Sequence, residues 1–594
     1  MNRIIEALKS NSKSLINSFS RFPLTALYLA FATGLTWYII WLKTPVPNYI
    51  EKLVYITVLG AIMSAAAQSA YERFSADENS PLRKINRLYY YICTVVLTGG
   101  YYIIIAPSIK ISEEVSARTI IAIFALVCIY LWVPSYKKMK DFNSVTLTHF
   151  KSIFIAILYA VVLSIGISSI IAAIDLLLYK VNSDTYAYSY SVIWIFFMTM
   201  YYLSILPKFN SILEEDVKKT EKVGAYPKFL DILISNIAIP ILAVFTGVLV
   251  IYFLKILITS KWPIGQVGPI VLGYSAAGIF IFILAGLLEN NFAKLYRTFF
   301  PKFLIGVVIM QLVSVYIRIN AYGVTESRYY VALFGIYSLV CGIILSIKPT
   351  GRNGLIVLIV AGFAIFSVVP PIDTFTVSRV SQINRIEGIL TSEGMLSNGK
   401  ITPKANPSEN AKIEITNILA YLDNRGYDPY VKWLPKDFDM YLQMKTVIGF
   451  EPYYKFNSGN LNDVYVSLDT SYALDITGYD SIFSIYSDPL NKAPTPTTTI
   501  VIRGVTYNVK VTSVSKFDSE VAILDSSGNT VISAKLYDFA RGVTGSSNQK
   551  NMLPPSVLSF ETAANGSSLK IIFQNIHLNN QGGNYGFYVL FKSK

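Results

Sequence analysis

Eight residues in or beside apolar segments have the chemistry to bind a charged ligand. They are Asp175, Lys255, Lys261, Trp262, Arg318, Tyr322, Glu326 and Arg328. Ionisable side chains at membrane depth are costly and often functional, and the guanidinium fork of arginine suits carboxylates and phosphates. We expect these residues to meet at the outer face of a membrane and to form a pocket for an anionic group such as a lipid headgroup. In the alternative interpretation, the basic side chains extend to the membrane interface and Asp175 pairs with one of them.

The residue patterns of familiar enzymes are missing from this sequence. Its two histidines, His149 and His577, stand in no zinc-binding spacing and in no plausible pair with a serine or cysteine. No P-loop or dinucleotide fingerprint occurs in the required context. We therefore predict no catalytic residue, no metal and no cofactor, and we reject an ATP-driven pump or a protease of familiar type.

Carboxylate chemistry in the C-terminal region stays open. The candidate residues are Asp423, Asp428, Asp437, Asp439, Asp475 and Asp480. Acidic residues in loops are usually solvated, and we favour that interpretation here. The sequence therefore leans away from an enzyme without deciding the question.

Eleven apolar segments precede the last part of the chain and would position the eight residues. They cover residues 22–42, 53–70, 85–105, 119–136, 152–179, 190–206, 229–259, 267–288, 303–323, 326–348 and 354–372. A helix of roughly 20 apolar residues crosses the hydrocarbon core, so we predict an α-helical polytopic membrane domain of about 11 transmembrane helices over residues 22–372. The second and sixth segments are short, and Pro240 should kink the seventh.

The basic residues are unevenly distributed among the loops. With a cytoplasmic N-terminus, 22 lysines and arginines fall on the inner side and nine on the outer side, as the positive-inside rule requires. An odd number of crossings then places the C-terminal region in the periplasm. The net charge of +14 comes from the membrane part, so we exclude nucleic acid as a partner. Within the inner loops, residues 214–222 carry both signs of charge and predict a solvated loop helix.

The N-terminal residues and the cysteines add two expectations. Residues 1–21 mix apolar and basic side chains and predict an interfacial helix, with a frayed basic tail as the alternative. The first apolar segment has no small-residue cleavage site after it, so we expect a retained span rather than a signal peptide. All three cysteines lie in apolar spans, so we expect no disulfide in the C-terminal region.

The C-terminal region divides into two patterns. Residues 376–397, 408–422 and 436–446 have helical spacing and predict a periplasmic helical subdomain over residues 373–450. Residues 451–594 instead alternate between apolar and polar side chains. The predicted strands cover residues 464–468, 472–476, 481–486, 499–503, 506–511, 521–524, 531–536, 569–573 and 587–591, with a hairpin turn at residues 525–530. Together these patterns predict a C-terminal α+β extracytoplasmic region that ends in an antiparallel β-sandwich.

Several strings along the chain carry a resemblance to a known family. They are Arg21-Phe-Pro-Leu-Thr25, Tyr226-Pro-Lys-Phe-Leu230, Lys255-Ile-Leu-Ile-Thr259, Trp262-Pro263, Tyr322-Gly-Val-Thr-Glu326-Ser-Arg328-Tyr329, Pro370 to Ile372, Ser381-Gln-Ile-Asn-Arg385, Tyr421-Leu422 and Asp475-Ile-Thr-Gly-Tyr-Asp480. The chain resembles the domain of unknown function 4153 family of polytopic bacterial membrane proteins, found mainly in Bacteroidota. The resemblance implies an inner-membrane protein of a double-membraned bacterium, and it implies no activity. It gives weight to Arg318 and to the string that follows it, which is the most specific of the set.

Three functions are compatible with this sequence, and each has the lipid bilayer as a partner. The favoured one is an envelope binding or assembly protein whose periplasmic β domain recognises a partner protein or glycan, because catalytic signatures are missing and the β region is large. The second is a transporter or lipid-handling protein with an anion-binding pocket at the outer face, although few charges in the span centres argue against ion-coupled transport. The third is a membrane enzyme that acts on a lipid-linked substrate.

Overall fold

The computed structural model describes most of the chain, in two compact units. The described residues are 14–43, 46–77, 80–107, 112–138, 141–211, 213–260, 267–348, 351–436, 438–453, 463–489, 498–546, 552–564, 566–579 and 582–594. The units are Met1–Arg385 and Ile386–Lys594.

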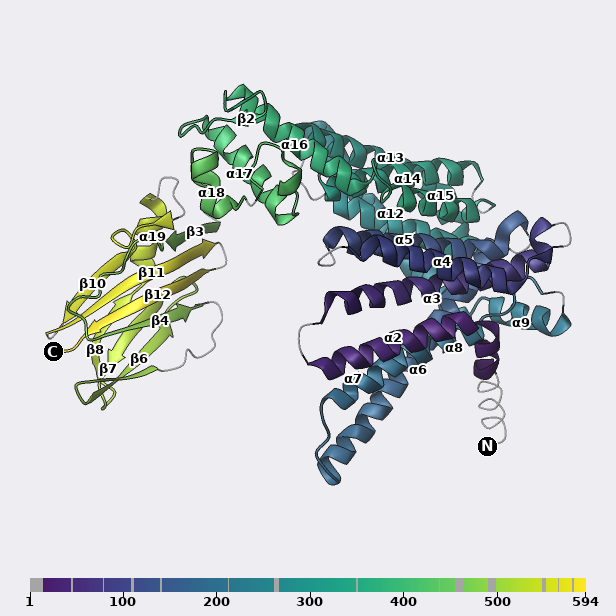
Figure 1. Cartoon of the computed structure of the whole chain (residues 1–594), viewed down its shortest axis with the longest axis horizontal. Helices are drawn as coiled ribbons and strands as arrows, with labels where there is room; N and C mark the ends of the chain where they lie inside the picture. The colour runs from purple at the N-terminus through teal and green to yellow at the C-terminus, as the bar shows by residue number, and fades with distance from the viewer. Residues whose placement is uncertain are drawn as a thin grey trace. The chain divides into compact units, whose positions relative to one another are not determined.

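The first unit is all helical (Figure 1). Its α-helices are α2 (Pro23–Leu42), α3 (Asn48–Ser75), α4 (Arg87–Ile105), α5 (Glu113–Trp132), α6 (Phe142–Leu177), α7 (Asp184–Ser191), α8 (Met198–Ile205), α9 (Glu214–Gly224), α10 (Lys228–Ile232), α11 (Ile239–Thr259), α12 (Val267–Leu284), α13 (Asn291–Tyr322), α14 (Glu326–Ile347), α15 (Asn353–Phe366) and most of α16 (Thr374–Ser392). Short 3-10 helices are η1 (Pro81–Lys84), η2 (Val133–Lys138) and η5 (Ala285–Leu287), and π-helical turns are η3 (Val192–Phe197) and η4 (Leu233–Ala238). Residues 14–21 are also helical, whereas the rest of the predicted interfacial segment lies outside the described residues.

Ten long apolar helical segments in residues 23–347 confirm the predicted polytopic membrane domain. The second and sixth apolar runs are short in the sequence. Each belongs to a longer helical segment, Asn48–Ser75 and Asp184–Ile205, whose additional turns are more polar. The eleventh segment differs from the others, because α15 has only 14 residues and rises about 21 Å as a helix. The described residues thus contain ten spans of full length and one shorter apolar helix.

Local signals shape the fifth and seventh spans. Asp141 caps α6, because its carboxylate accepts a hydrogen bond from the Ser144 amide at 3.0 Å. The helix therefore begins before the predicted start at residue 152, and His149, expected in a loop, lies within it. Pro240 stands at the start of α11, directly after the π-helical turn η4. Pro240 was expected to kink the helix because a proline cannot donate a backbone hydrogen bond. In the structure this irregularity is the wider π-helical turn η4.

Glycines allow close packing among α12, α13 and α14. A Cβ atom at Gly278 of α12 would come within 2.3 Å of the Phe300 ring, and one at Gly342 of α14 would come within 3.2 Å of the Pro301 carbonyl oxygen. Small residues at such contacts let helices approach closely in an apolar environment. Fully buried side chains such as Leu304 and Phe282 fill the core that these helices share.

The second unit combines helices with β-sheets. Its helices after α16 are α17 (Glu409–Asn424), the 3-10 turn η6 (Asp428–Tyr430), α18 (Met440–Val447) and α19 (Tyr537–Ser546). Its strands are β1 (Leu396–Ser397), β2 (Lys400–Ile401), β3 (Asp463–Leu468), β4 (Ser481–Ser487), β5 (Thr498–Ile502), β6 (Val505–Ser513), β7 (Ser519–Leu524), β8 (Thr530–Lys535), β9 (Met552–Leu553), β10 (Ser559–Ala564), β11 (Ser567–Asn579) and β12 (Gly583–Lys592). The three predicted helices correspond to α16, α17 and α18.

Two antiparallel sheets confirm the main expectation for the C-terminal region. The larger has the order β4-β12-β11-β3-β9 with β10 paired to β11, and the smaller has the order β5-β6-β7-β8. Only the short β3–β9 contact is parallel among the described pairs. Both sheets contribute to one core, which also contains Ala540 and Val543 of α19. The region is therefore mixed α/β with antiparallel sheets, and these do not clearly form the predicted sandwich.

Side-chain hydrogen bonds explain one correct and one wrong local prediction. The hairpin turn between β7 and β8 forms because Asp525 Oδ1 accepts from the amides of Ser527 and Asn529, both at 2.9 Å. The predicted strand at residues 472–476 does not form. There, Asp475 Oδ1 accepts from the Thr477 amide at 2.9 Å, and this local turn competes with strand pairing.

Candidate functional site

Four of the eight predicted site residues lie at the end of the helix bundle where α13 ends and α14 begins. The tight connection between these helices, residues 322–328, is called the corner below. Gly323 has φ +70 and ψ 177, a conformation that is essentially restricted to glycine. Arg328 Nη1 donates to the carbonyl oxygens of Tyr322 at 3.0 Å and Gly323 at 2.7 Å. The Arg328 side chain therefore stabilises the turn that brings it there.

The middle of α16 binds the same corner. Gln382 Nε2 donates to the carbonyl oxygens of Tyr322 at 3.0 Å and Val324 at 2.9 Å. The Val324 amide donates to Ser381 Oγ at 2.9 Å, and the Arg385 guanidinium lies 5.8 Å from the centre of the Tyr322 ring. These contacts give a structural role to residues that the sequence analysis assigned to a ligand.

Arg318 lies on a small cavity beside the corner. This cavity has a volume of about 150 Å³ and is lined by Arg318, Arg328, Ser314 and Ser327, among others. Arg318 Nε is buried and has no hydrogen-bond partner among the described residues. Glu326 is only 8% exposed at the start of α14. Arg318 and Arg328 thus line the same small space, and its use as an anion pocket stays a prediction.

Of the other four predicted residues, the structure describes Asp175 and Lys255. Asp175 binds locally at the end of α6, where it accepts from the Val181 amide at 2.7 Å and lies 3.3 Å from Lys180 Nζ. Lys255 is exposed on α11, among exposed apolar side chains such as Leu254 and Ile258. Lys261 and Trp262 lie outside the described residues. The proposed sharing of one site by all eight residues therefore remains a prediction.

A buried ion pair at this same end of the bundle begins α16. The Asp373 side chain is fully buried, and its Oδ1 lies 3.1 Å from Arg118 Nη2. The same oxygen accepts from the amides of Phe375 and Thr376 at 3.1 Å. Burial alone would raise the pKa of Asp373, but the hydrogen bonds from Thr376 and Arg118 outweigh it and hold the pKa below its usual value.

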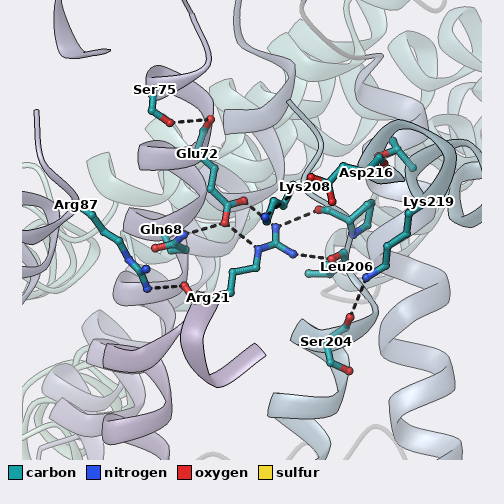
Figure 2. Close-up of polar contacts among 12 residues, drawn as sticks. Arg21, Gln68, Glu72, Ser75, Arg87, Ser204, Leu206, Lys208, Asp216 and Lys219 are labelled. Carbon is teal, nitrogen blue, oxygen red and sulfur yellow. Dashed lines mark hydrogen bonds and ion pairs between the residues drawn. The ribbon is translucent and has the colours of Figure 1, made fainter. Parts of the chain in front are cut away.

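The opposite end of the bundle holds a larger cavity that the sequence patterns did not predict. Its volume is about 800 Å³. The charged residues that line it are Arg21, Glu72, Arg87, Lys208, Asp216, Lys218, Lys219 and Lys222. We call it the basic cavity. It lies where α2 and α4 begin and where α3 and α8 end, so residues distant in the sequence meet there (Figure 2).

Arg21 and Glu72 form a largely buried ion pair in the wall of the basic cavity. Arg21 Nε and Nη2 donate to the two Glu72 oxygens at 2.8 and 2.7 Å, and the two side chains are only 15% and 18% exposed. Other N–H groups of Arg21 donate to the carbonyl oxygens of Leu206 at 2.6 Å and Pro207 at 3.1 Å. The pair therefore connects the start of α2 with the end of α3 and the chain after α8 (Figure 2).

A hydrogen-bonded chain extends this contact to α4. Arg87 Nη2 donates to the Arg21 carbonyl oxygen at 2.8 Å, and Arg87 Nε donates to the Tyr91 hydroxyl at 2.7 Å. The Tyr91 hydroxyl donates to Gln68, which in turn donates to Glu72 at 2.8 Å. Arg21 and Arg87 are thus committed to protein acceptors and form a fixed wall of the cavity.

The lysines of the basic cavity are less constrained. Lys208 Nζ lies 3.9 Å from Asp216 Oδ2, and its side chain is 49% exposed. Lys219 Nζ donates to the Ser204 carbonyl oxygen at 3.3 Å, and Lys222 is exposed. Residues 214–222 form the predicted helix, α9, which is solvent-exposed at Glu214 and Lys218 and which also lines the cavity. In the sequence, the density of basic residues in this loop was the feature that could have indicated these lysines. We used that density only to orient the chain in the membrane.

Ten long apolar helices, polar networks at both ends and a separate unit with antiparallel sheets define a multi-pass membrane protein. The chain belongs to the family described as Domain of unknown function (DUF4153), which it matches over residues 29–398, more than half of its length. This confirms the resemblance found in the sequence. No curated protein and no solved structure matches the chain.

Proposed function

We propose that this chain is an anion-binding, lipid-handling membrane protein whose ligand carries a phosphate or carboxylate group and binds in the basic cavity. The observation that carries the proposal is the charge of the cavity wall, where six cationic side chains face two carboxylates. Arg21 pairs with Glu72, Lys208 lies near Asp216, and Lys218 pairs with Glu214 outside the lining. With Arg87, Lys219 and Lys222 also in the lining, the surplus of charge is positive. Lysine ammonium groups are mobile point charges that suit phosphate oxygens.

The proposal places the basic cavity at the cytoplasmic face of the inner membrane of a double-membraned bacterium. The positive-inside rule supports this orientation, because the loops at the cavity end carry most of the basic residues. If α15 completes an eleventh crossing, the C-terminal region is periplasmic. Reporter-enzyme fusions after residues 350 and 594 test this topology, with a cytoplasmic signal expected from the first alone. Cytoplasmic signals from both fusions would overturn the eleventh crossing.

The anion-binding role is tested by titrating the purified full-length protein in detergent with inorganic phosphate and glycerol 3-phosphate. The double variant Lys208→Gln/Lys222→Gln should weaken binding by about tenfold, since partly exposed charge contacts contribute about 0.5–1 kcal/mol each. Lys294→Gln is the matched control, because this lysine lies at the same end of the bundle and outside the cavity lining. Undetectable binding to the wild type, or equal loss in the control, would reject the proposal.

The corner supports a smaller anion site in the same proposal. Arg318 and Arg328 both line the cavity of about 150 Å³, and the buried Arg318 Nε is free of a partner within the described part of the chain. Arg318→Gln should then remove a second, weaker phosphate-binding event from the titration. An unchanged number of binding events would restrict the function to the basic cavity.

A second candidate function is recognition of a partner protein or glycan by a periplasmic β region. It is favoured by β4, which pairs with β12 alone among the described strands and exposes Ile482 by 42% and Tyr486 by 59%. An open strand edge with alternate apolar side chains suits binding by strand addition. Photo-crosslinking from position 486 in cells should recover a specific partner, and crosslinking from Ser515 on the β6–β7 connection serves as the control. Recovery of the same species from both positions would contradict this role.

A further inference from the structure

A third cavity lies among α2, α3, α5 and α8, and its wall is almost entirely apolar. Its volume is about 350 Å³, and both this cavity and the basic cavity fall in the ~300–1,000 Å³ range of small-molecule sites. Ala32 of α2 and Ala61 and Ala65 of α3 line it and are 5%, 6% and 7% exposed. Short side chains at these three positions leave the space that larger residues would fill. We call it the apolar cavity.

The apolar cavity adjoins the basic cavity. Leu203 lines both of them and directly precedes Ser204, whose carbonyl oxygen accepts a hydrogen bond from Lys219. On α2, Thr25 lines the apolar cavity only four residues after Arg21 of the basic cavity. A cationic space and a hydrocarbon-like space therefore meet within about one helical turn.

The apolar cavity is also accessible from the surface of the helix bundle. Val58 of α3 and Ile153 of α6 line it, and each is 41% exposed. Both belong to apolar spans whose exposed faces contact lipid in a multi-pass membrane protein. A hydrocarbon chain could therefore enter from the bilayer without crossing the polar network around Arg21.

The geometry points to a phosphate-bearing lipid as the ligand, with its headgroup at the lysines of the basic cavity and its hydrocarbon chain in the apolar cavity. This inference rests on the proposed anion-binding function and specifies the ligand class. Charge complementarity selects an anionic headgroup, and the adjoining apolar wall selects an attached hydrocarbon chain. A free phosphate or a soluble phosphate ester would fill the basic cavity alone.

Three probes separate the two halves of the proposed ligand. Dioctanoyl phosphatidic acid carries headgroup and chains, glycerol 3-phosphate carries the headgroup alone, and dioctanoylglycerol carries the chains alone. We expect the full-length protein, measured by native mass spectrometry at constant detergent concentration, to bind phosphatidic acid at least about tenfold more tightly than either other probe, because apolar burial and charge contacts both contribute.

The outcomes distinguish failure of this inference from failure of the proposed function. Equal binding of glycerol 3-phosphate and phosphatidic acid would overturn the lipid inference and leave anion binding intact. No binding of any phosphate-bearing probe would overturn both. Equal binding of dioctanoylglycerol and phosphatidic acid, insensitive to Lys208→Gln/Lys222→Gln, would indicate unspecific apolar binding and would also overturn the inference.

Filling the apolar cavity provides the matched variant test. Ala32→Leu places a larger side chain in the cavity, whereas Ala30→Leu makes the same change two residues away at an exposed position of α2. Ala32→Leu should weaken phosphatidic acid binding about tenfold or more and leave glycerol 3-phosphate binding unchanged. The unchanged headgroup binding also shows that the variant is folded. Ala61→Leu on α3 repeats the test if Ala32→Leu does not fold, and equal effects of Ala32→Leu and Ala30→Leu would overturn the inference.

Discussion

The two ends of the helix bundle both gather arginines, but they use them differently. At the corner, Arg328 donates to backbone carbonyl oxygens and stabilises the chain reversal between α13 and α14. At the basic cavity, Arg21 is bound to Glu72 and to carbonyl oxygens, while the lysines around it are constrained less. The cavity volumes differ as well, at about 150 Å³ and about 800 Å³.

This difference shows that an arginine near a membrane interface is a weak indicator of a ligand. A guanidinium group has five donors, and nearby carbonyl oxygens can occupy most of them. The better indicator is a surplus of cations that remains after the protein's own acceptors have been counted. By that measure the basic cavity, rather than the corner, is the stronger candidate for a binding site.

The largest expected effect on stability comes from the buried ion pair of the basic cavity. Arg21→Ala leaves the Glu72 carboxylate buried without its main partner and should lower the free energy of unfolding by about 3–5 kcal/mol. Thermal unfolding of the detergent-solubilised protein measures the loss. Lys43→Ala removes the more exposed pair with Asp184, where the lysine is 64% exposed, and should cost less than about 1 kcal/mol. Similar losses of stability in the two variants would show that the Arg21–Glu72 pair contributes no more than an exposed ion pair.

The corner should respond most to a change at Gly323. Gly323→Ala forces a side chain into a conformation that costs about 1–3 kcal/mol, and its Cβ would lie 2.8 Å from Gln382 Nε2. Gly306→Ala on α13 is the control, because a Cβ there meets nothing within 4 Å. A stability of Gly323→Ala equal to that of the control would contradict the described corner.

A smaller, pH-dependent effect is expected at Asp373. The pKa of Asp373 is lower in the folded protein than the unfolded pKa of about 4. The ionised carboxylate therefore stabilises the fold above about pH 4. This stabilisation is lost as the pH falls through the lower pKa of the folded state. Asp373→Asn keeps an acceptor for the α16 amides but loses the charge contact with Arg118, so it should cost about 1 kcal/mol at pH 7. The difference from the wild type should shrink below pH 4. A constant difference across this range would exclude the charge as its cause.

The smallest effect on stability should come from the lysines of the basic cavity. Lys208→Gln/Lys222→Gln should change the free energy of unfolding by less than about 0.5 kcal/mol, as is usual for exposed side chains, although it weakens phosphate binding. Thermal unfolding and phosphate titration of the same preparation give both numbers. A large loss of stability would show that these lysines, like Arg21, hold the fold together.

Much of the fold was predictable because it depends on local patterns. Apolar runs of suitable length predicted the spans, and alternation from residue 463 onward predicted most of the strands. Some local predictions failed. The Asp475 turn competes with strand pairing and replaces a predicted strand. The short helix α19 interrupts the strand pattern and was not predicted. The eleventh span was drawn too long, since α15 ends at Phe366 although apolar residues continue beyond it.

The candidate site was predictable only in part. The string at residues 322–329 was recognised as important, and the structure places Tyr322, Glu326 and Arg328 in the corner with Arg318 on the cavity beside it. Asp175 and Lys255 were assigned to the same level from their depth in the spans. Depth does not determine which helices are neighbours or which face a side chain occupies: Asp175 bonds locally beside Lys180, and Lys255 is exposed on α11.

The sequence by itself determined the class of the protein, because hydrophobic length and periodicity are properties of consecutive residues. It also determined that the basic residues gather in alternate loops. Only the tertiary structure decided what those residues do there, because Arg21, Glu72, Arg87 and Lys219 come from four separated segments. Their distances depend on how the helices pack, and that packing turns a topology signal into the wall of a cavity.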